Sequence, residues 1–145
     1  PYGRPDMAYY KFTAAIDEGS PIDVFNNGEM LRDFTYIDDI IEGILRLVPK
    51  IPMPIRTDIS NALAPFSIFN IGNNSPVSLR RFISSIETAL GKSATENRLP
   101  MQPGDVPKTF ADISDLIRDY SYTPSTDIKT GILHFTNWFL SYESS

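Results

Sequence analysis

Residues 32–48, RDFTYIDDIIEGILRLV, lead from an extended segment directly into an apolar helix. The first five residues, 32–36, are expected to be extended. From about Ile37 to Val48 the apolar residues recur at helical spacing, which predicts an amphipathic helix with one core-facing stripe. The members of this stripe are Ile37, Ile40, Ile41, Ile44, Leu45 and Val48. This junction of extended segment and helix places the chain among folds that mix both kinds of element.

Further helix and strand signals lie on both sides of this stretch. Capping residues and apolar spacing predict three helices: Asp6–Gly19 with Asp6 as N-cap, a second that begins after the Ser78 cap and ends at Gly91, and a third over Ser114–Tyr120. A last helix is predicted from about Ser125 or Thr126 onward. Its inward-facing residues are Ile128, Ile132, Phe135, Trp138 and Phe139. Strands are predicted at Pro21–Phe25, Phe66–Ile71 and Thr95–Met101, with an irregular connection from Pro49 to about Pro65. We expect an α+β (α/β) fold with more helix than strand, in one domain over residues 1–145.

Composition excludes several classes of protein. The chain has 145 residues and a net charge of −5, whereas proteins that grip nucleic-acid phosphates carry a basic surplus. It has no cysteine and one histidine, which excludes thiolate or multi-histidine metal sites. The charge-free run 59–79 contains asparagines and prolines that a bilayer core would not accept. We therefore expect no nucleic acid, no metal and no membrane as partners, and a cytoplasmic location.

Three residues are candidates for binding an anionic ligand, each with a simpler alternative. Arg32 follows a glycine turn, so its guanidinium is suited to a diphosphate; the alternative is an ion pair with Glu29 or Asp33. Arg4 precedes a helix start, where amides favour anions, or it is a mobile terminal side chain. Asp105 lies on a Pro-Gly-Asp loop, where a carboxylate can accept ribose hydroxyls or bind its own backbone.

The sequence lacks the residue patterns that nicotinamide redox chemistry and its acid–base catalysis need. A dinucleotide fingerprint needs closely spaced glycines, but the two closest here, Gly19 and Gly28, are nine positions apart. No tyrosine precedes a lysine by four positions. Adjacent Asp38 and Asp39 point in different directions on a helix, which favours a helix-start role, and His134 has no identifiable catalytic partner. We therefore expect neither a catalytic residue nor a cofactor site in this chain, and with no initiator Met we interpret it as a fragment.

Several strings, in order, resemble one family over essentially the whole chain. They are GRPDMA (3–8), KFT (11–13), DVFNNG (23–28), RDFTYIDD (32–39), FNIG (69–72) and LPMQPGDV (99–106). They resemble the C-terminal portion of nucleotide-sugar epimerases of the extended short-chain dehydrogenase/reductase family, and most of all UDP-glucuronate 4-epimerases. The resemblance implies a small substrate-binding domain whose parent enzyme holds NAD and the catalytic Tyr and Lys in an N-terminal Rossmann domain. NAD there oxidises the sugar at C4 and returns hydride to the other face.

The resemblance also implies roles for single residues. Arg32 matches an arginine that contacts the diphosphate, and Asp105 an acidic residue that holds the ribose. Asp23 and Phe25 match positions whose backbone groups bind uracil. Arg4 and Gln102 complete the candidate set: Arg4 matches an arginine near the sugar end, and Gln102 stands where UDP-galactose epimerases often carry an arginine.

Other functions stay open on the sequence alone. The same motifs fit part of a nucleotide-sugar dehydratase or decarboxylase, whose reaction is decided mainly outside this region, or a non-catalytic interaction domain of the same fold. A domain built to pack on a Rossmann partner exposes an apolar patch when it is alone. We therefore expect contact with that N-terminal domain, and a homodimer or self-association.

Overall fold

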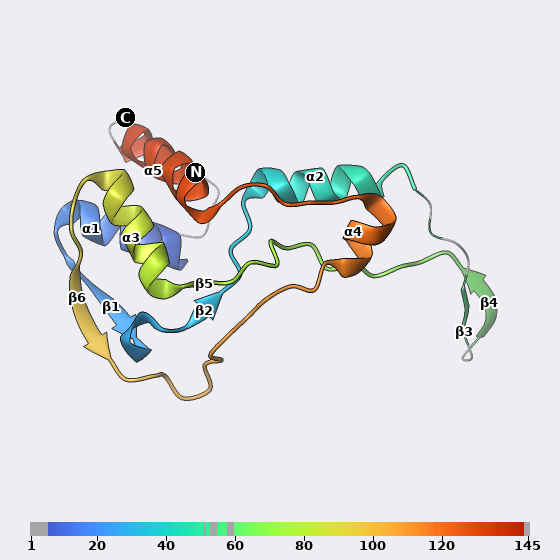
Figure 1. Cartoon of the computed structure of the whole chain (residues 1–145), viewed down its shortest axis with the longest axis horizontal. Helices are drawn as coiled ribbons and strands as arrows, with labels where there is room; N and C mark the ends of the chain where they lie inside the picture. The colour runs from blue at the N-terminus through green and yellow to red at the C-terminus, as the bar shows by residue number, and fades with distance from the viewer. Residues whose placement is uncertain (1–5, 51, 53–54, 58–59, 144–145) are drawn as a thin grey trace.

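Two clusters of buried side chains organise the chain into an elongated molecule (Figure 1). The computed structural model describes residues 6–50, 52, 55–57 and 60–143. The larger cluster lies at the end of the molecule that holds α1 (Ala8–Glu18), α3 (Leu79–Leu90) and α5 (Ile128–Glu143). The smaller cluster lies under α2 (Ile37–Leu47) and α4 (Ser114–Tyr120). Extended segments run between the two clusters and hold the candidate site.

The larger cluster is built from three helices and a parallel strand pair. β1 (Pro21–Phe25) pairs with β6 (Thr95–Leu99) in register from Pro21↔Thr95 to Phe25↔Leu99. Parallel pairing requires a long crossover, and α3 is part of it. The core consists of Ile16, Ile22, Val24, Met30, Leu79, Phe82, Ile83, Ile86 and Ile132. Phe82 is fully buried, and its ring stacks on Phe34 with centroids 4.5 Å apart.

The smaller cluster consists of Ile113, Leu116 and Tyr122. The Tyr122 hydroxyl donates to the carbonyl of Gly72 at 3.2 Å, so the buried ring also satisfies its polar atom. Burial raises the pKa of Tyr122, and the carboxylates of Asp39 and Asp33 raise it further. The phenol therefore stays protonated and keeps this bond at neutral pH.

One short strand pair lies between the two clusters, and a second lies beyond them. β2 (Leu31–Arg32) pairs antiparallel with β5 (Val77–Ser78). The turn before β2 is the 3-10 helix η1 (Asn26–Gly28), where Gly28 has φ +74° and a Cβ would lie 2.8 Å from the Arg80 side chain. A glycine is required there for both reasons. A hairpin of β3 (Ile55–Thr57) and β4 (Ser60–Ala64) lies at the far end of the molecule.

Most predicted elements are confirmed. The strand over 21–25 and the helix over 114–120 have the predicted bounds. Ser78 caps α3 by accepting the backbone N–H of Arg81, and Gly91 ends it in the left-handed conformation, as Gly19 ends α1. The fold class is confirmed as well, with more helix than strand and strands that are short.

Four local predictions are wrong. Met7, not Asp6, is the N-cap of α1, because the carbonyl of Met7 accepts the first helical bonds. The stretch 49–65 contains the β3–β4 hairpin rather than only irregular chain. Residues 66–71 form no strand, because no described backbone segment pairs with them. Ile68 in that segment is 85% exposed.

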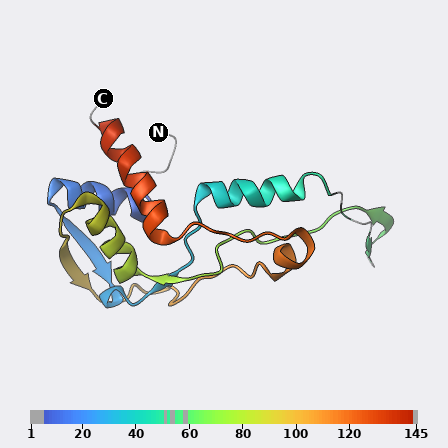
Figure 2. The same ribbon diagram turned by 45° about the horizontal axis from the view of Figure 1, so that its top comes forward.

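The predicted core-facing stripe of α2 is the fourth error. The helix forms as predicted, but most members of its stripe are exposed: Ile37, Ile41, Ile44, Leu45 and Val48. The buried side of α2 instead carries Gly43, which lies against Ile71 and Tyr122. In both views α2 lies apart from α1 and α3 (Figure 2), so the larger core does not reach its apolar face.

The described residues offer neither a membrane-spanning helix nor a cluster of metal ligands. Among the described helices, none combines the length and the apolar character that a bilayer crossing needs. Within the same residues, no group of three or more acidic or histidine side chains is placed to hold a metal ion.

Candidate functional site

The candidate site lies where β2 runs beside the segment that follows β6. The backbone N–H of Leu31 donates to the carbonyl of Pro107 at 2.9 Å, and the N–H of Thr109 donates to the carbonyl of Leu31 at 3.1 Å. This parallel bridge fixes the register of the two segments. As a result Arg32 and Asp105, 73 positions apart in the chain, lie side by side.

The Arg32 guanidinium is held by four acceptors on its two terminal nitrogens. Nη2 donates to Oδ1 of Asp105 at 2.6 Å and to the sulfur of Met30 at 3.6 Å. Nη1 donates to the carbonyls of Val106 at 2.8 Å and Leu31 at 2.9 Å. The side chains of Arg32 and Asp105 are 26% and 27% exposed, so the pair is shielded on one side and reachable from the other. The alternative of an ion pair with Glu29 or Asp33 is therefore wrong.

A tight turn presents the carboxylate of Asp105. The N–H of Asp105 donates to the carbonyl of Gln102 at 3.2 Å, and Gly104 between them has φ +83°. Oδ1 of Asp105 also accepts the N–H of Val106 at 2.8 Å, which is the backbone contact expected of a turn aspartate. One carboxylate oxygen is thus fixed by an amide and a guanidinium, and within the described residues Oδ2 has no hydrogen-bond partner.

Of the other candidate residues, only Gln102 shares a turn with this pair. Gln102 is exposed in the same turn as Asp105. Phe25 is half-buried at the end of β1, opposite Leu99, which precedes Gln102 by three positions. Asp23 is exposed on β1 and accepts the side-chain amide of Asn97 at 2.8 Å. Arg4 lies outside the described residues.

Two aspartates have roles that the sequence did not reveal. Asp33 accepts three backbone N–H groups, from Asn74 at 3.0 Å, Ser75 at 3.2 Å and Ala111 at 3.0 Å. Asp39 was expected to serve the start of its own helix. Its buried carboxylate instead accepts backbone N–H groups from residues 125 and 126, just before α5, at 3.1 and 3.0 Å. The sequence carries no signal for either role, because the partners are backbone amides far along the chain.

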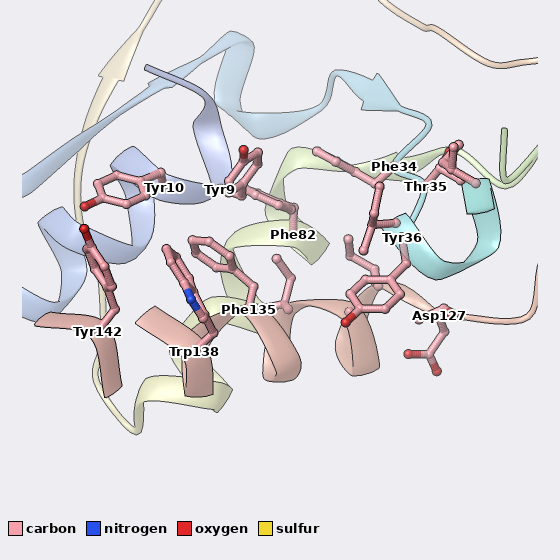
Figure 3. A pocket seen from close by; sticks show the side chains of 16 residues that line it. Tyr9, Tyr10, Phe34, Thr35, Tyr36, Phe82, Asp127, Phe135, Trp138 and Tyr142 are labelled. Carbon is pink, nitrogen blue, oxygen red and sulfur yellow. The ribbon is translucent and has the colours of Figure 1, made fainter. Parts of the chain in front are cut away.

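A separate, mainly aromatic pocket of about 620 Å³ lies between α1, α5 and residues 34–40 (Figure 3). Helices α1 and α5 supply most of the labelled rings, and Phe34, Tyr36 and Phe82 add three more. The rings of α1 and α5 are Tyr9, Tyr10, Phe135, Trp138 and Tyr142. Tyr36 lines the same pocket, and its hydroxyl lies 3.2 Å from Nδ1 of His134. Arg32 and Asp105 do not line it. The pocket is therefore distinct from the ion pair, and its apolar lining suits an apolar surface better than a diphosphate.

The first half of the chain matches a known protein family. Residues 1–72 match the model of the NAD dependent epimerase/dehydratase family. The chain belongs to this epimerase family. Its match ends at Gly72, so it includes the RDFTYIDD string but not the Asp105 turn.

Curated relatives extend the similarity of this epimerase-family chain to nearly all of its length. It is 49% identical to "Protein CapI" of Staphylococcus aureus over 148 residues, which covers 98% of this chain and 44% of that protein. It is 44% identical to a "Probable UDP-glucuronate 4-epimerase" of Rhizobium meliloti, covering 96% and 43%. It is 41% identical to UDP-glucuronate 4-epimerase 1 of Arabidopsis thaliana, covering 98% and 34%. The chain therefore spans less than half the length of these relatives.

Solved structures of epimerases confirm the fold. The crystal structure of UDP-glucuronic acid 4-epimerase from Bacillus cereus, in complex with UDP-glucuronic acid and NAD, superposes with a TM-score of 0.80 and 31% identity. It covers 98% of this chain and 42% of that one. A dTDP-glucose 4,6-dehydratase from Bacillus anthracis has the same fold with a TM-score of 0.77 at 17% identity. The fold alone therefore does not separate epimerases from dehydratases.

Proposed function

We propose that this chain is the UDP-sugar-binding portion of an NAD-dependent UDP-glucuronate 4-epimerase, and that it acts in the cytoplasm. The observation that carries the proposal is the pairing of Arg32 with Asp105 on two segments held in register. Relatives named as UDP-glucuronate 4-epimerases align over nearly the whole chain. The similar Bacillus cereus structure holds UDP-glucuronic acid, which identifies the class of ligand to test.

In this proposal Arg32 binds the diphosphate and Asp105 the ribose. A guanidinium is planar and suits a bidentate oxyanion, and here it already holds a carboxylate oxygen at 2.6 Å. A diphosphate oxygen takes the place of Oδ1 on Nη2, while the ribose hydroxyls donate to the released carboxylate. The pair has no net charge, so turning the carboxylate to the ribose moves its negative charge away from the diphosphate and leaves the guanidinium free to bind it.

The remaining members of the site extend the ligand in two directions. In this proposal backbone groups of Asp23 and Phe25 on β1 bind the uracil ring, and Arg4 binds the sugar. Gln102 lies in the turn of Asp105. In this proposal its side-chain amide donates a neutral hydrogen bond to phosphate. A neutral amide contributes less to phosphate binding than an arginine does.

NAD is assigned to the parent enzyme and not to this chain. A dinucleotide site needs a glycine-rich turn at a helix N-terminus, and the sequence has no such glycine spacing. The chain also lacks a Tyr-x-x-x-Lys pair. We therefore assign no reaction step to its residues, and propose that the chain alone does not epimerise its substrate. Incubation with NAD and UDP-glucuronate should yield no UDP-galacturonate, and turnover above background would overturn this part.

The exposed apolar face of α2 points to a partner. Four aliphatic side chains of α2 and that of its C-cap Val48 are 43–73% exposed, which is unusual for one contiguous apolar face. The chain spans less than half of its relatives, so we propose that the N-terminal Rossmann portion of the parent enzyme covers this face. In its absence the same face would mediate self-association.

The direct experiment is a titration of the chain with UDP-glucuronate, followed by calorimetry or NMR. A charge-assisted hydrogen bond contributes about 1.5–3 kcal/mol, so Arg32→Ala should weaken binding about 10- to 100-fold. Arg118→Ala is the matched control, because Arg118 pairs with acidic residues on exposed α4. Equal affinities of the two variants would remove Arg32 from the site.

A further inference from the structure

The Asp33 carboxylate is joined to two separate segments of the chain. Oδ2 accepts the N–H groups of Asn74 and Ala111, both at 3.0 Å, and Oδ1 accepts the N–H of Ser75 at 3.2 Å. These donors lie 41, 78 and 42 positions away in sequence. The side chain forms no ion pair within the described residues, so all of its described acceptor contacts serve the backbone.

One of these segments is the one that carries Asp105. Residues 105–111 are attached to β2 and its neighbour at three successive points. Arg32 binds the carboxylate at 105 and the carbonyl at 106, Leu31 bridges residues 107 and 109, and Asp33 binds the N–H of Ala111. Three consecutive residues therefore hold one strip of backbone, with Arg32 and Asp33 at its two ends.

The second segment is packed too closely to shift freely. A Cβ placed on Gly72 would lie 2.4 Å from Cβ of Ala111 and 3.3 Å from Oδ2 of Asp33. A glycine is therefore required for the two loops to meet at the carboxylate. A small polar pocket of about 330 Å³ is lined by this junction, including Asp33, Gly72 and Ala111.

We infer that Asp33 is a positioning residue for the diphosphate site. By holding the far end of segment 105–111, it keeps Asp105 and the carbonyl of Val106 in register with the Arg32 guanidinium. Two hydrogen bonds at that guanidinium depend on this register. The inference rests on the proposed function, because it takes the Arg32–Asp105 pair as the ligand site.

Asp39 provides a matched control within the same chain. Its carboxylate also accepts two backbone N–H groups, of Ser125 and Thr126, and it is 6% exposed. The segment that it holds leads into α5, whereas Arg32 and Asp105 belong to other segments. Loss of Asp39 therefore reports what a backbone-binding aspartate contributes to stability alone.

The experiment compares Asp33→Asn, Asp39→Asn and Arg32→Ala in the full chain. We measure the UDP affinity by NMR titration, the melting temperature, and the amide hydrogen exchange of residues 105–111. Asp33→Asn should weaken UDP binding about 2- to 10-fold and speed exchange at Ala111 and across 105–109. Asp39→Asn should lower the melting temperature by a similar amount but leave UDP affinity and exchange at 105–111 unchanged.

The outcomes separate the two claims. If Arg32→Ala leaves UDP affinity unchanged, the proposed function fails. If Arg32→Ala weakens binding but Asp33→Asn binds like Asp39→Asn, the proposed function stands and the positioning role of Asp33 is overturned. If Asp33→Asn does not fold, amide hydrogen exchange in the unaltered chain tests the inference instead. The amides of Asn74, Ser75 and Ala111 are expected to be protected together. Exchange at the rate of an open loop would overturn the inference.

Discussion

Nη2 of Arg32 lies 2.6 Å from Oδ1 of Asp105, and both side chains are about one quarter exposed. Ion pairs this accessible to water add little to folding stability, about 0–1 kcal/mol. The neighbouring carbonyls of Leu31 and Val106 also accept from the same guanidinium. The arrangement thus fixes the direction of a planar cation at an open surface, which is what binding of an oxyanion requires.

The Asp105 carboxylate should compete with simple phosphates for Arg32. Asp105→Asn removes the competing charge, so the affinity for inorganic pyrophosphate should rise about 2- to 5-fold. UDP should gain less, because the ribose loses a charged acceptor. Titration of both ligands gives the ratio of their affinities, with Asp115→Asn on α4 as the control. An unchanged ratio would contradict the roles given to the pair.

Phe82 should dominate the larger core. Its ring is fully buried and lies on Phe34, so Phe82→Ala leaves a cavity that the helices cannot fill. Truncation of a buried Phe costs about 3–5 kcal/mol of unfolding free energy. Chemical denaturation measures this, with Phe110→Ala as the matched control because Phe110 is 58% exposed. A similar loss in both variants would refute the assignment of the core.

The apolar face of α2 should drive association of the chain with itself. Leu45 is 60% exposed on this face, so Leu45→Gln should weaken the association constant about 10-fold without destabilising the fold. Leu133 on α5 is exposed to 46%, and Leu133→Gln should leave association unchanged. Sedimentation velocity across a concentration series measures both. Equal effects of the two changes would argue against a specific α2 interface.

The Asp127 carboxylate at the start of α5 should make the stability of the chain depend on pH. Its carboxylate accepts the backbone N–H of Thr130 at 2.8 Å, and this bond holds the pKa of Asp127 below the ordinary value of 3.8. A lowered folded-state pKa adds stability above the unfolded value, and this is lost as pH falls through the folded value. The melting temperature of Asp127→Ala should therefore lie below that of the unaltered chain at neutral pH. The gap should narrow as the pH falls below 3.8, and a constant gap would contradict this linkage.

The sequence predicted correctly those elements whose ends are fixed by capping residues close by in the chain. Ser78 and Gly91 bound α3 by a side-chain cap and a left-handed glycine, both of which depend on a few adjacent positions. The segment 66–71 and the α2 stripe were mispredicted for the opposite reason. Their apolar patterns require a covering surface, and the described chain covers only part of each: Phe69 and Ile71 pack against the smaller cluster, whereas Ile68 and most of the α2 stripe are exposed. Sequence periodicity indicates that a face is apolar but not which molecule buries it.

The candidate site was predicted only in part. Arg32 and Asp105 were candidates from their turns and side-chain chemistry, the family resemblance gave them roles, and only the fold shows their contact. Asp33 and Asp39 were missed because their partners are backbone amides far along the chain. Every residue except proline has such an amide, so no residue type marks these partners in the sequence.

NMR mapping of UDP-glucuronate binding tests the central claim most directly. The isotope-labelled chain is titrated to millimolar ligand, and amide shifts are followed for every assigned residue. We expect the largest saturable changes at residues 31–32, 102 and 104–106, lost in Arg32→Ala and retained in Arg118→Ala. The absence of saturable shifts there, or shifts confined to the aromatic pocket between α1 and α5, would contradict the account.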